Sequence, residues 1–210
     1  MIRGLLFDLD GTLVDSLPGI AAALNLALVD HDLATFTQEE VTEFIGNGAQ
    51  VLAEKALGSR KDELGPALLE GFQKHYKEAW KSGTTIYPSM GDLIEKAQQQ
   101  GLKIGVLSNK PHAYTQEIVH ALFGTDLFDP VEGHREEFPK KPDPTTALLI
   151  AEKWGLKPEE VAYVGDSTVD LATARAAQML PAIVTWGYGT PDDCPLSHSM
   201  DELASFLGLH

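Results

Sequence analysis

Two aspartates at the end of an apolar run are the first residues of this sequence that could do chemistry. Asp8 and Asp10 stand in the segment LLFDLDGTLVDS, at the end of a mainly apolar run over residues 2–9. This pattern predicts a strand buried on both faces, as in a parallel sheet. Because a charge is costly to bury unless it is paired, such a strand does not end in two carboxylates without a cation nearby. The segment therefore predicts a site in which Asp8 and Asp10 face positive charge.

Three other polar segments follow strand-like runs in the same way. LSNK and GDSTVD each end a strongly apolar run, and PKKPDP follows the weaker run FDPVEG. Because ligands lie beyond the carboxyl ends of parallel strands, we expect all of these segments at one edge of a sheet. The side chains brought to this edge are Asp8, Asp10, Ser108, Lys141, Asp166 and Asp170.

The carboxylates gathered at this edge predict a magnesium site. Carboxylates that lie close together repel, so at least one of them is protonated unless a cation intervenes. Two or three carboxylates, with a backbone carbonyl and waters, form the all-oxygen ligand set that Mg²⁺ prefers. The sequence thus implies Mg²⁺ as the cofactor.

A metal-bound cluster of this kind suits the transfer of a phosphoryl group. With the metal present, Asp8 can stay ionised and attack phosphorus to form an aspartyl phosphate. Asp10 is placed to give a proton to the leaving alkoxide and then to take one from the water that opens the intermediate. The two aspartates of the opening segment are therefore interpreted as nucleophile and general acid/base.

The other polar residues of these segments are expected to bind the phosphoryl group. Ser108 can donate a hydrogen bond to a phosphoryl oxygen, and Lys141 can neutralise both that group and the attacking carboxylate. Free backbone amides at Gly11 and Thr12, and at a helix start near Asn109, are expected to bind the remaining oxygens. The sequence thus assigns these five residues to phosphate binding.

The pattern of strands and helices predicts an α/β protein with an insertion. Residues 17–83 show helical periodicity without a convincing strand, whereas from residue 84 onward strand-like and helical runs alternate. Alternation of this kind is typical of βαβ units and a doubly wound, Rossmann-like parallel sheet. We therefore expect a discontinuous core of residues 1–16 and 84–210, with residues 17–83 forming an all-helical cap domain.

The composition limits the classes of partner. Sixteen Lys and Arg residues stand against 31 Asp and Glu residues, for a formal net charge of −15, and a surface this acidic repels nucleic acid and anionic lipid. The single cysteine excludes an intramolecular disulfide, and no apolar stretch is long enough for a signal peptide or a membrane span. We expect a cytoplasmic monomer or weak homodimer that acts on a small-molecule phosphomonoester, with no nucleic-acid or membrane partner.

The four segments DLDGTLVDS, LSNK, KKPDP and GDSTVD resemble, in order, the four motifs of the haloacid dehalogenase-like hydrolase superfamily. The resemblance covers the whole chain, including a helical cap between the first and second motifs. It implies Asp8 as nucleophile, Asp10 as general acid/base, and Ser108 with a lysine in the phosphate site. The family lysine directly precedes proline, and this selects Lys141 over Lys140.

The resemblance also implies a ligand set for Mg²⁺. Asp8, the backbone carbonyl of Asp10, and Asp166 would bind the metal, with Asp170 supporting directly or through water.

Within this superfamily, the segments DSLPGIAAALNLAL, FIGNGAQVLAEKALG, LSNKP and GYGTP look most like phosphoglycolate phosphatases. This likeness implies 2-phosphoglycolate as the substrate and places substrate specificity in the cap loop of Gly46, Asn47 and Gly48. The stretch EGHREE departs from the Gly-Asp-rich pattern of that group. Sugar phosphatase, nucleotidase, pyrophosphatase and phosphomutase activities stay open as alternatives. A non-enzymatic, receiver-like protein that holds a phosphate is a further class, against which Asp10 and the inserted cap both argue.

Simpler explanations exist for some of these residues. Asp166 and Asp170 could place negative charge at a helix N-terminus, which is favourable without any metal. Ser108 could cap the helix that follows it. The loop of residues 46–48 could be an ordinary turn between two helices.

Overall fold

The computed structural model describes residues 1–189 and 191–209 of the chain. Thr190, in the GYGTP stretch, and His210, at the end of the expected core, lie outside the described residues. The chain divides into two compact units, one of Met1–Val14 with Ile86–His210 and the other of Asp15–Thr85. The first unit contains the sheet. The second unit is helical, except that its first and last residues, Asp15 and Thr85, belong to short strands.

A six-stranded sheet forms the centre of the first unit. Its strands lie in the order β5-β4-β1-β6-β7-β8, and each neighbouring pair is parallel. The first strand in sequence thus lies between two strands that come much later in the chain. The prediction of a parallel, doubly wound α/β core is confirmed. The strands are β1 (Gly4–Phe7), β4 (Lys103–Pro111), β5 (Val131–His134), β6 (Val161–Gly165), β7 (Leu180–Val184) and β8 (Leu196–Ser197).

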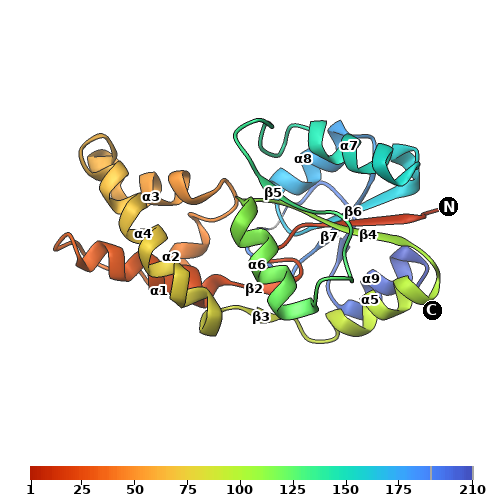
Figure 1. Cartoon of the computed structure of the whole chain (residues 1–210), viewed down its shortest axis with the longest axis horizontal. Helices are drawn as coiled ribbons and strands as arrows, with labels where there is room; N and C mark the ends of the chain where they lie inside the picture. Colours follow the sequence, from red (N-terminus) through yellow and green to blue (C-terminus); the bar gives the residue numbers. More distant parts are fainter. Residues whose placement is uncertain (190, 210) are drawn as a thin grey trace. The chain divides into compact units, whose positions relative to one another are not determined.

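Five helices cover the two faces of this sheet. Figure 1 shows α7 and α8 on one face and α5 and α9 on the other, while α6 packs against β4 and β5. Because both faces are covered, every residue of β1 is buried, which explains its continuous apolar sequence. The helices are α5 (Met90–Gln99), α6 (His112–Phe123), α7 (Thr145–Trp154), α8 (Thr168–Ala176) and α9 (Met200–Leu207).

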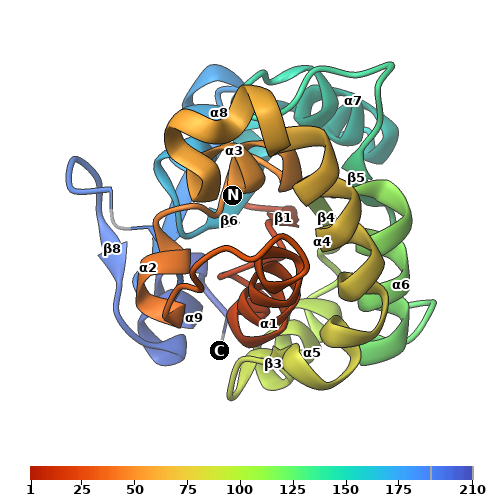
Figure 2. The same cartoon turned by 90° about the vertical axis from the view of Figure 1, so that its left-hand side faces the viewer.

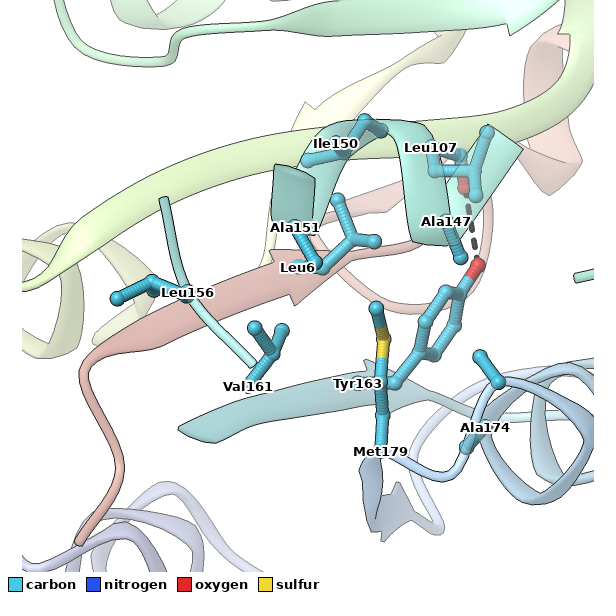
Figure 3. Packing of buried hydrophobic residues seen from close by; sticks show 11 residues of the cluster. Leu6, Leu107, Ala147, Ile150, Ala151, Leu156, Val161, Tyr163, Ala174 and Met179 are labelled. Carbon is cyan, nitrogen blue, oxygen red and sulfur yellow. Dashed lines mark hydrogen bonds between the residues drawn. The ribbon is translucent and has the colours of Figure 1, made fainter. Parts of the chain in front are cut away.

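The core between the sheet and helices α7 and α8 is centred on Tyr163. Its ring packs in a cluster with Leu6, Ile150 and Met179, and Figure 3 shows its hydroxyl directed at the backbone of Leu107. That hydroxyl donates a hydrogen bond of 3.2 Å to the carbonyl of Leu107. The buried tyrosine therefore links β6 to β4 directly before Ser108, a residue of the predicted site.

The helical unit is built on the pair α1 (Leu17–Val29) and α4 (Lys61–Gly83), which lie side by side in Figure 2. The shorter elements are α2 (Gln38–Thr42), α3 (Ala49–Leu57) and the 3₁₀ turn Gly58–Arg60. Thr37 and Glu40, the first and last residues of TQEE, form a capping box at the start of α2. Two short strands, β2 (Val14–Asp15) and β3 (Thr85–Ile86), pair where the chain passes between the units. No helix in the described part of the chain is long and apolar enough to cross a membrane.

Two elements differ from the sequence-based expectation. The last strand of the sheet, β8, was not expected, because two residues are too few to show a period-2 pattern. The strand-like run PAIVTWGYG is a strand only in its first part, because β7 ends at Val184. Residues 185–189 instead lie in a loop that returns to Asp166, at the edge of the sheet where the polar segments gather.

We predict that Gly83→Ala destabilises the helical unit. A Cβ on Gly83 would overlap the backbone of Gly19 in α1, and neither backbone can yield without separating the two helices. Overpacking of this kind costs about 1–3 kcal/mol. Thermal or denaturant unfolding measures the loss. Gly91→Ala is the matched control, because a Cβ on Gly91 meets no atom within 4 Å. Equal stability of the two variants would contradict the close approach of α1 and α4.

Candidate active site

Three buried carboxylates meet at the carboxyl ends of β1 and β6. Asp8 follows the last residue of β1, and its amide continues the strand pairing by donating to the carbonyl of Val164 at 2.9 Å. Asp166 follows β6 directly, and Asp170 lies in the first turn of α8. One oxygen from each of the three carboxylates lies within 4.8 Å of the others. The structure therefore brings together residues that are about 160 positions apart in sequence, as the parallel-sheet argument predicts.

Asp170 is fixed by the start of α8 and also faces the cluster. The hydroxyl of Ser167 accepts a hydrogen bond from the amide of Asp170, and Oδ2 of Asp170 accepts from the amide of Ser167 at 3.1 Å. This capping box shows that helix-terminal placement does account for one oxygen of Asp170. Its other oxygen, Oδ1, lies 2.7 Å from Nζ of Lys141.

Asp166 is held by groups from two separate loops. Its Oδ2 accepts hydrogen bonds from the backbone amides of Tyr188 at 2.6 Å and Gly189 at 3.2 Å, and its Oδ1 accepts from the Thr12 hydroxyl at 3.0 Å. Burial nevertheless raises the pKa of Asp166 to about 7, with a further rise from Asp170 that these hydrogen bonds only partly offset. Without a cation, this carboxylate is costly to ionise.

Lys141 supplies positive charge to the cluster. Its Nζ lies 2.9 Å from Oδ1 of Asp8 and 2.7 Å from Oδ1 of Asp170, and its side chain is only 4% exposed. Burial opposes the charge, but Asp170 and Asp8 raise the pKa of Lys141 well above its usual value. The neighbouring Lys140 is only half-buried. The structure thus places Lys141, the lysine directly before proline, at the candidate nucleophile.

Asp8 is also buried against charge of its own sign. Burial raises its pKa to about 8, against the lowering effect of Lys141 and with further rises from Asp170 and Asp166. Its Oδ1 is paired with Lys141 by charge but accepts no hydrogen bond among the described residues. An oxygen in this state is suited to a further cation.

Asn109 positions Lys141 through its backbone. The Asn109 side chain donates a hydrogen bond of 3.1 Å to the carbonyl of Lys141 and accepts one of 2.9 Å from its amide. These paired bonds join the end of β4 to the loop that carries the lysine. Asn109 therefore lies in the site, with its side chain engaged in fixing that loop.

The helix start expected near Asn109 lies at Pro111 and His112, three residues further along the chain. Strand β4 continues to Pro111, and α6 begins at His112. Ser108 is not the cap of that helix either, because Pro111 occupies the cap position and the Ser108 hydroxyl accepts from the amide of Lys110 at 3.2 Å. The buried Ser108 hydroxyl lies instead at the strand end, and its contact with phosphate stays a prediction.

The expectation of free amides at Gly11 and Thr12 is wrong. The amide of Gly11 donates to the carbonyl of Val14 at 2.9 Å, and the amide of Thr12 donates to the carbonyl of Leu9 at 3.3 Å. These bonds close the turn that follows β1, in which Gly11 has a φ of +83°. A Cβ on Gly11 would collide with the carboxylate of Asp166, so the glycine is required both by the turn and by this close approach.

The residue that the sequence analysis missed is Lys110. Its Nζ lies 2.9 Å and 3.0 Å from the two carboxylate oxygens of Asp10, and the two side chains are 7% and 14% exposed. The only available signal was the last letter of LSNK, and a lysine after a strand is more often a surface residue. The structure thus adds a second buried ion pair beside the one at Asp8.

Gly46, Asn47 and Gly48 lie in the helical unit, in a bend before α3. Gly48 is the residue before the helix and has a φ of +91°, while a Cβ on Gly46 would meet no atom within 4 Å. The backbone is thus that of an ordinary turn between helices. A role in substrate specificity stays a prediction.

The acidic cluster fits a divalent cation. Three buried carboxylates face one another, Asp8 offers an oxygen without a hydrogen bond, and all the donors are hard oxygen ligands. A single ammonium group, that of Lys141, contacts two of these carboxylates. Residues 8, 166 and 170 are therefore the candidate ligands, and a metal there would remove the charge imbalance.

Comparison with known proteins agrees with this fold and site. The family model of haloacid dehalogenase-like hydrolases matches residues 5–184. The phosphoglycolate phosphatase of Escherichia coli K12 is 36% identical over 235 aligned positions, covering 99% of this chain and 93% of the relative, and that of Salmonella typhi is 37% identical with the same coverage. The chain belongs to the haloacid dehalogenase-like hydrolase family.

Solved structures place the chain near the phosphatases of this family. A candidate phosphoglycolate phosphatase from Lactobacillus delbrueckii subsp. bulgaricus has a TM-score of 0.90 at 26% identity and covers 98% of both chains. A protein from Haemophilus somnus 129pt, described as a predicted phosphoglycolate phosphatase, has a TM-score of 0.86 at 30% identity and covers 99% of this chain and 97% of that one. Within its family, the chain is a hydrolase of phosphatase type that is similar to phosphoglycolate phosphatases over its whole length.

The raised pKa values predict how pH affects the metal-free protein. Between the usual aspartate value of 3.8 and the folded values of about 7 for Asp166 and about 8 for Asp8, the folded chain holds protons that the unfolded chain has released. Stability contributed by these two groups therefore falls as pH rises through this window. A bound divalent cation replaces the protons and removes the loss.

We expect the gain in unfolding free energy from adding Mg²⁺ in place of EDTA to grow between about pH 5 and about pH 8. Denaturant titrations at each pH measure this gain, and Asp166→Asn is the control in which the gain shrinks. A gain that stays constant across the range would contradict metal binding at this cluster.

Proposed function

We propose that the chain is a Mg²⁺-dependent phosphatase that hydrolyses a small phosphomonoester, 2-phosphoglycolate in the first place, through an aspartyl-phosphate intermediate. The observation that carries the proposal is the buried contact between Asp8, Lys141 and Asp170 at the end of β1. Full-length similarity to proteins named phosphoglycolate phosphatase supports the choice of substrate.

In the first half of the reaction, a carboxylate oxygen of Asp8 attacks phosphorus while the bond from phosphorus to the ester oxygen breaks. Lys141 holds the carboxylate in place and offsets charge on the phosphoryl oxygens. The Ser108 hydroxyl, buried at the end of β4, binds one of those oxygens. When bound by Asp8, Asp166 and the backbone carbonyl of Asp10, with Asp170 directly or through water, Mg²⁺ would supply positive charge to the phosphate and reduce its repulsion of Asp8.

In the second half, water attacks phosphorus and the bond from phosphorus to Asp8 breaks, which releases inorganic phosphate. Asp10 has given its proton to the departing alkoxide, so its carboxylate can take a proton from this water. Asp10 follows Asp8 by two positions and has a bridge-type backbone contact with Val14, which fixes the turn that carries it. The side chain of Asp10 is thus carried by a turn that is closed by backbone pairing.

The helical unit is proposed to act as a cap. We assign the catalytic core to residues 1–16 and 84–210 and the cap to residues 17–83, with Gly46, Asn47 and Gly48 in the loop that contacts the substrate. A lid of this kind excludes bulk water and selects small substrates. The protein is proposed to work in the cytoplasm as a monomer or weak homodimer, without nucleic-acid or membrane partners, in keeping with its net charge of −15.

Asp8→Asn should abolish turnover while the fold is retained, because the amide has nearly the same shape but cannot attack phosphorus. Phosphate release from 2-phosphoglycolate, sugar phosphates, nucleoside monophosphates and pyrophosphate, each with Mg²⁺ and with EDTA, measures this loss. Asp126→Asn removes a charge from an exposed loop and serves as the control. Metal-dependent turnover that survives in Asp8→Asn would overturn the assignment of the nucleophile, and a best substrate other than 2-phosphoglycolate would redirect the proposal to that ester.

Asp10→Asn should lower kcat by roughly 10²–10⁴-fold, the usual effect of losing a general acid/base. The loss should be larger with alkyl esters than with p-nitrophenyl phosphate, because p-nitrophenolate leaves readily without a proton. Steady-state kinetics on both esters makes the comparison. An equal loss on the two would show that Asp10 is not the proton donor.

A further inference from the structure

Lys110 places a buried cation beside the proposed proton donor and apart from the three-carboxylate cluster. Its Nζ contacts both oxygens of Asp10, whereas Lys141 contacts Asp8 and Asp170. In the proposed reaction, Asp8 and Lys141 face the phosphoryl group and Asp10 faces the leaving oxygen. The two lysines therefore serve different parts of the substrate.

The backbone of Lys110 is fixed by hydrogen bonds and close packing. Its amide donates to the Ser108 hydroxyl at 3.2 Å, and its carbonyl accepts from the Thr115 hydroxyl at 3.2 Å. Pro111 follows it with a fixed φ, and a Cβ on Gly133 would overlap the Lys110 carbonyl. These contacts fix the backbone of Lys110, and the hydrogen bonds of its ammonium group to Asp10 direct the side chain toward the proposed proton donor.

Geometry limits where the leaving group can lie. To transfer a proton, Asp10 must come within about 2.6–3.2 Å of the ester oxygen. The Nζ of Lys110, 2.9 Å from Oδ1 of Asp10, is then no more than about two hydrogen-bond lengths from that oxygen. A carboxylate on the carbon next to the ester oxygen falls inside this distance. An ammonium group has three N–H donors and can bridge two carboxylates.

We propose that Lys110 binds a carboxylate carried by the leaving group and so selects phosphate esters of 2-hydroxycarboxylates. This inference rests on the proposed function and deepens it, because it assigns the substrate class to a residue of the core. The hydrogen bonds to Asp10 hold the ammonium group in position, and an incoming carboxylate accepts a further N–H of the same group.

The test is a pair of substrates that differ only in the second anion. Ethyl phosphate replaces the carboxylate of 2-phosphoglycolate with a methyl group. We expect Lys110→Met to lower the ratio of kcat/KM for 2-phosphoglycolate to that for ethyl phosphate by about 10–100-fold, the range for loss of a charged hydrogen bond. Lys110→Arg keeps the positive charge and should restore much of the ratio. An unchanged ratio in Lys110→Met, with both esters equally slowed, would overturn the inference and leave Lys110 as a residue that only positions Asp10.

A binding measurement separates this inference from the proposed chemistry. In the Asp8→Asn background, which cannot attack phosphorus, calorimetry gives the affinity for each ester with and without Lys110→Met. We expect Lys110→Met to weaken the binding of 2-phosphoglycolate by about 10–100-fold and to weaken the binding of ethyl phosphate much less. Equal weakening of both esters would contradict carboxylate binding. Failure of the wild-type chain to hydrolyse p-nitrophenyl phosphate would instead overturn the phosphatase proposal, while the binding comparison still decides the role of Lys110.

Discussion

The burial of three carboxylates around one ammonium group is the constraint on which the rest of the site depends. Asp8, Asp166 and Asp170 lie close together with almost no exposure, and Lys141 contacts two of them. In the low dielectric of a protein interior, such like charges repel strongly and are stable only with compensating cations. The raised pKa values of Asp8 and Asp166 show that Lys141 alone does not compensate them. The site therefore fits a further cation, and in the proposed mechanism such a cation would allow Asp8 to react as an anion.

The fold supplies this arrangement through strand order and through glycine. Because β1 lies between β4 and β6, the segments that follow these three strands share one end of the sheet. The backbone must then pass very close to the buried carboxylates. A Cβ at Gly11 or Gly187 would collide with Asp166, and one at Gly165 would collide with Asp170. Each of these glycines leaves room for an acidic side chain. The first glycine of GYG, Gly187, is therefore required by packing against the charged site.

Much of the site could be predicted from sequence because strand ends in a parallel sheet converge whatever their distance along the chain. This rule placed Asp8, Asp166 and Asp170 together, and the proline after Lys141 selected it over Lys140. The rule does not reveal hydrogen bonding within turns. The amides at Gly11 and Thr12 are engaged in closing the turn after β1, and β4 runs on to Pro111, two residues beyond LSN. Lys110 was missed because nothing in LSNK shows that its side chain is buried on Asp10. The two-residue strand β8 carried no periodic signal at all.

The assignment of Asp8 as nucleophile is the central claim, and trapping its phosphorylated form tests it most directly. Turnover of a phosphomonoester that the wild-type chain hydrolyses would be stopped with acid, the acyl phosphate reduced with borohydride, and the peptides analysed by mass spectrometry. The account predicts that the side chain of Asp8 is converted to that of homoserine, only when both substrate and Mg²⁺ are present. An Asp8 peptide that stays unmodified during measured turnover, or a reduced carboxylate at another position, would contradict it.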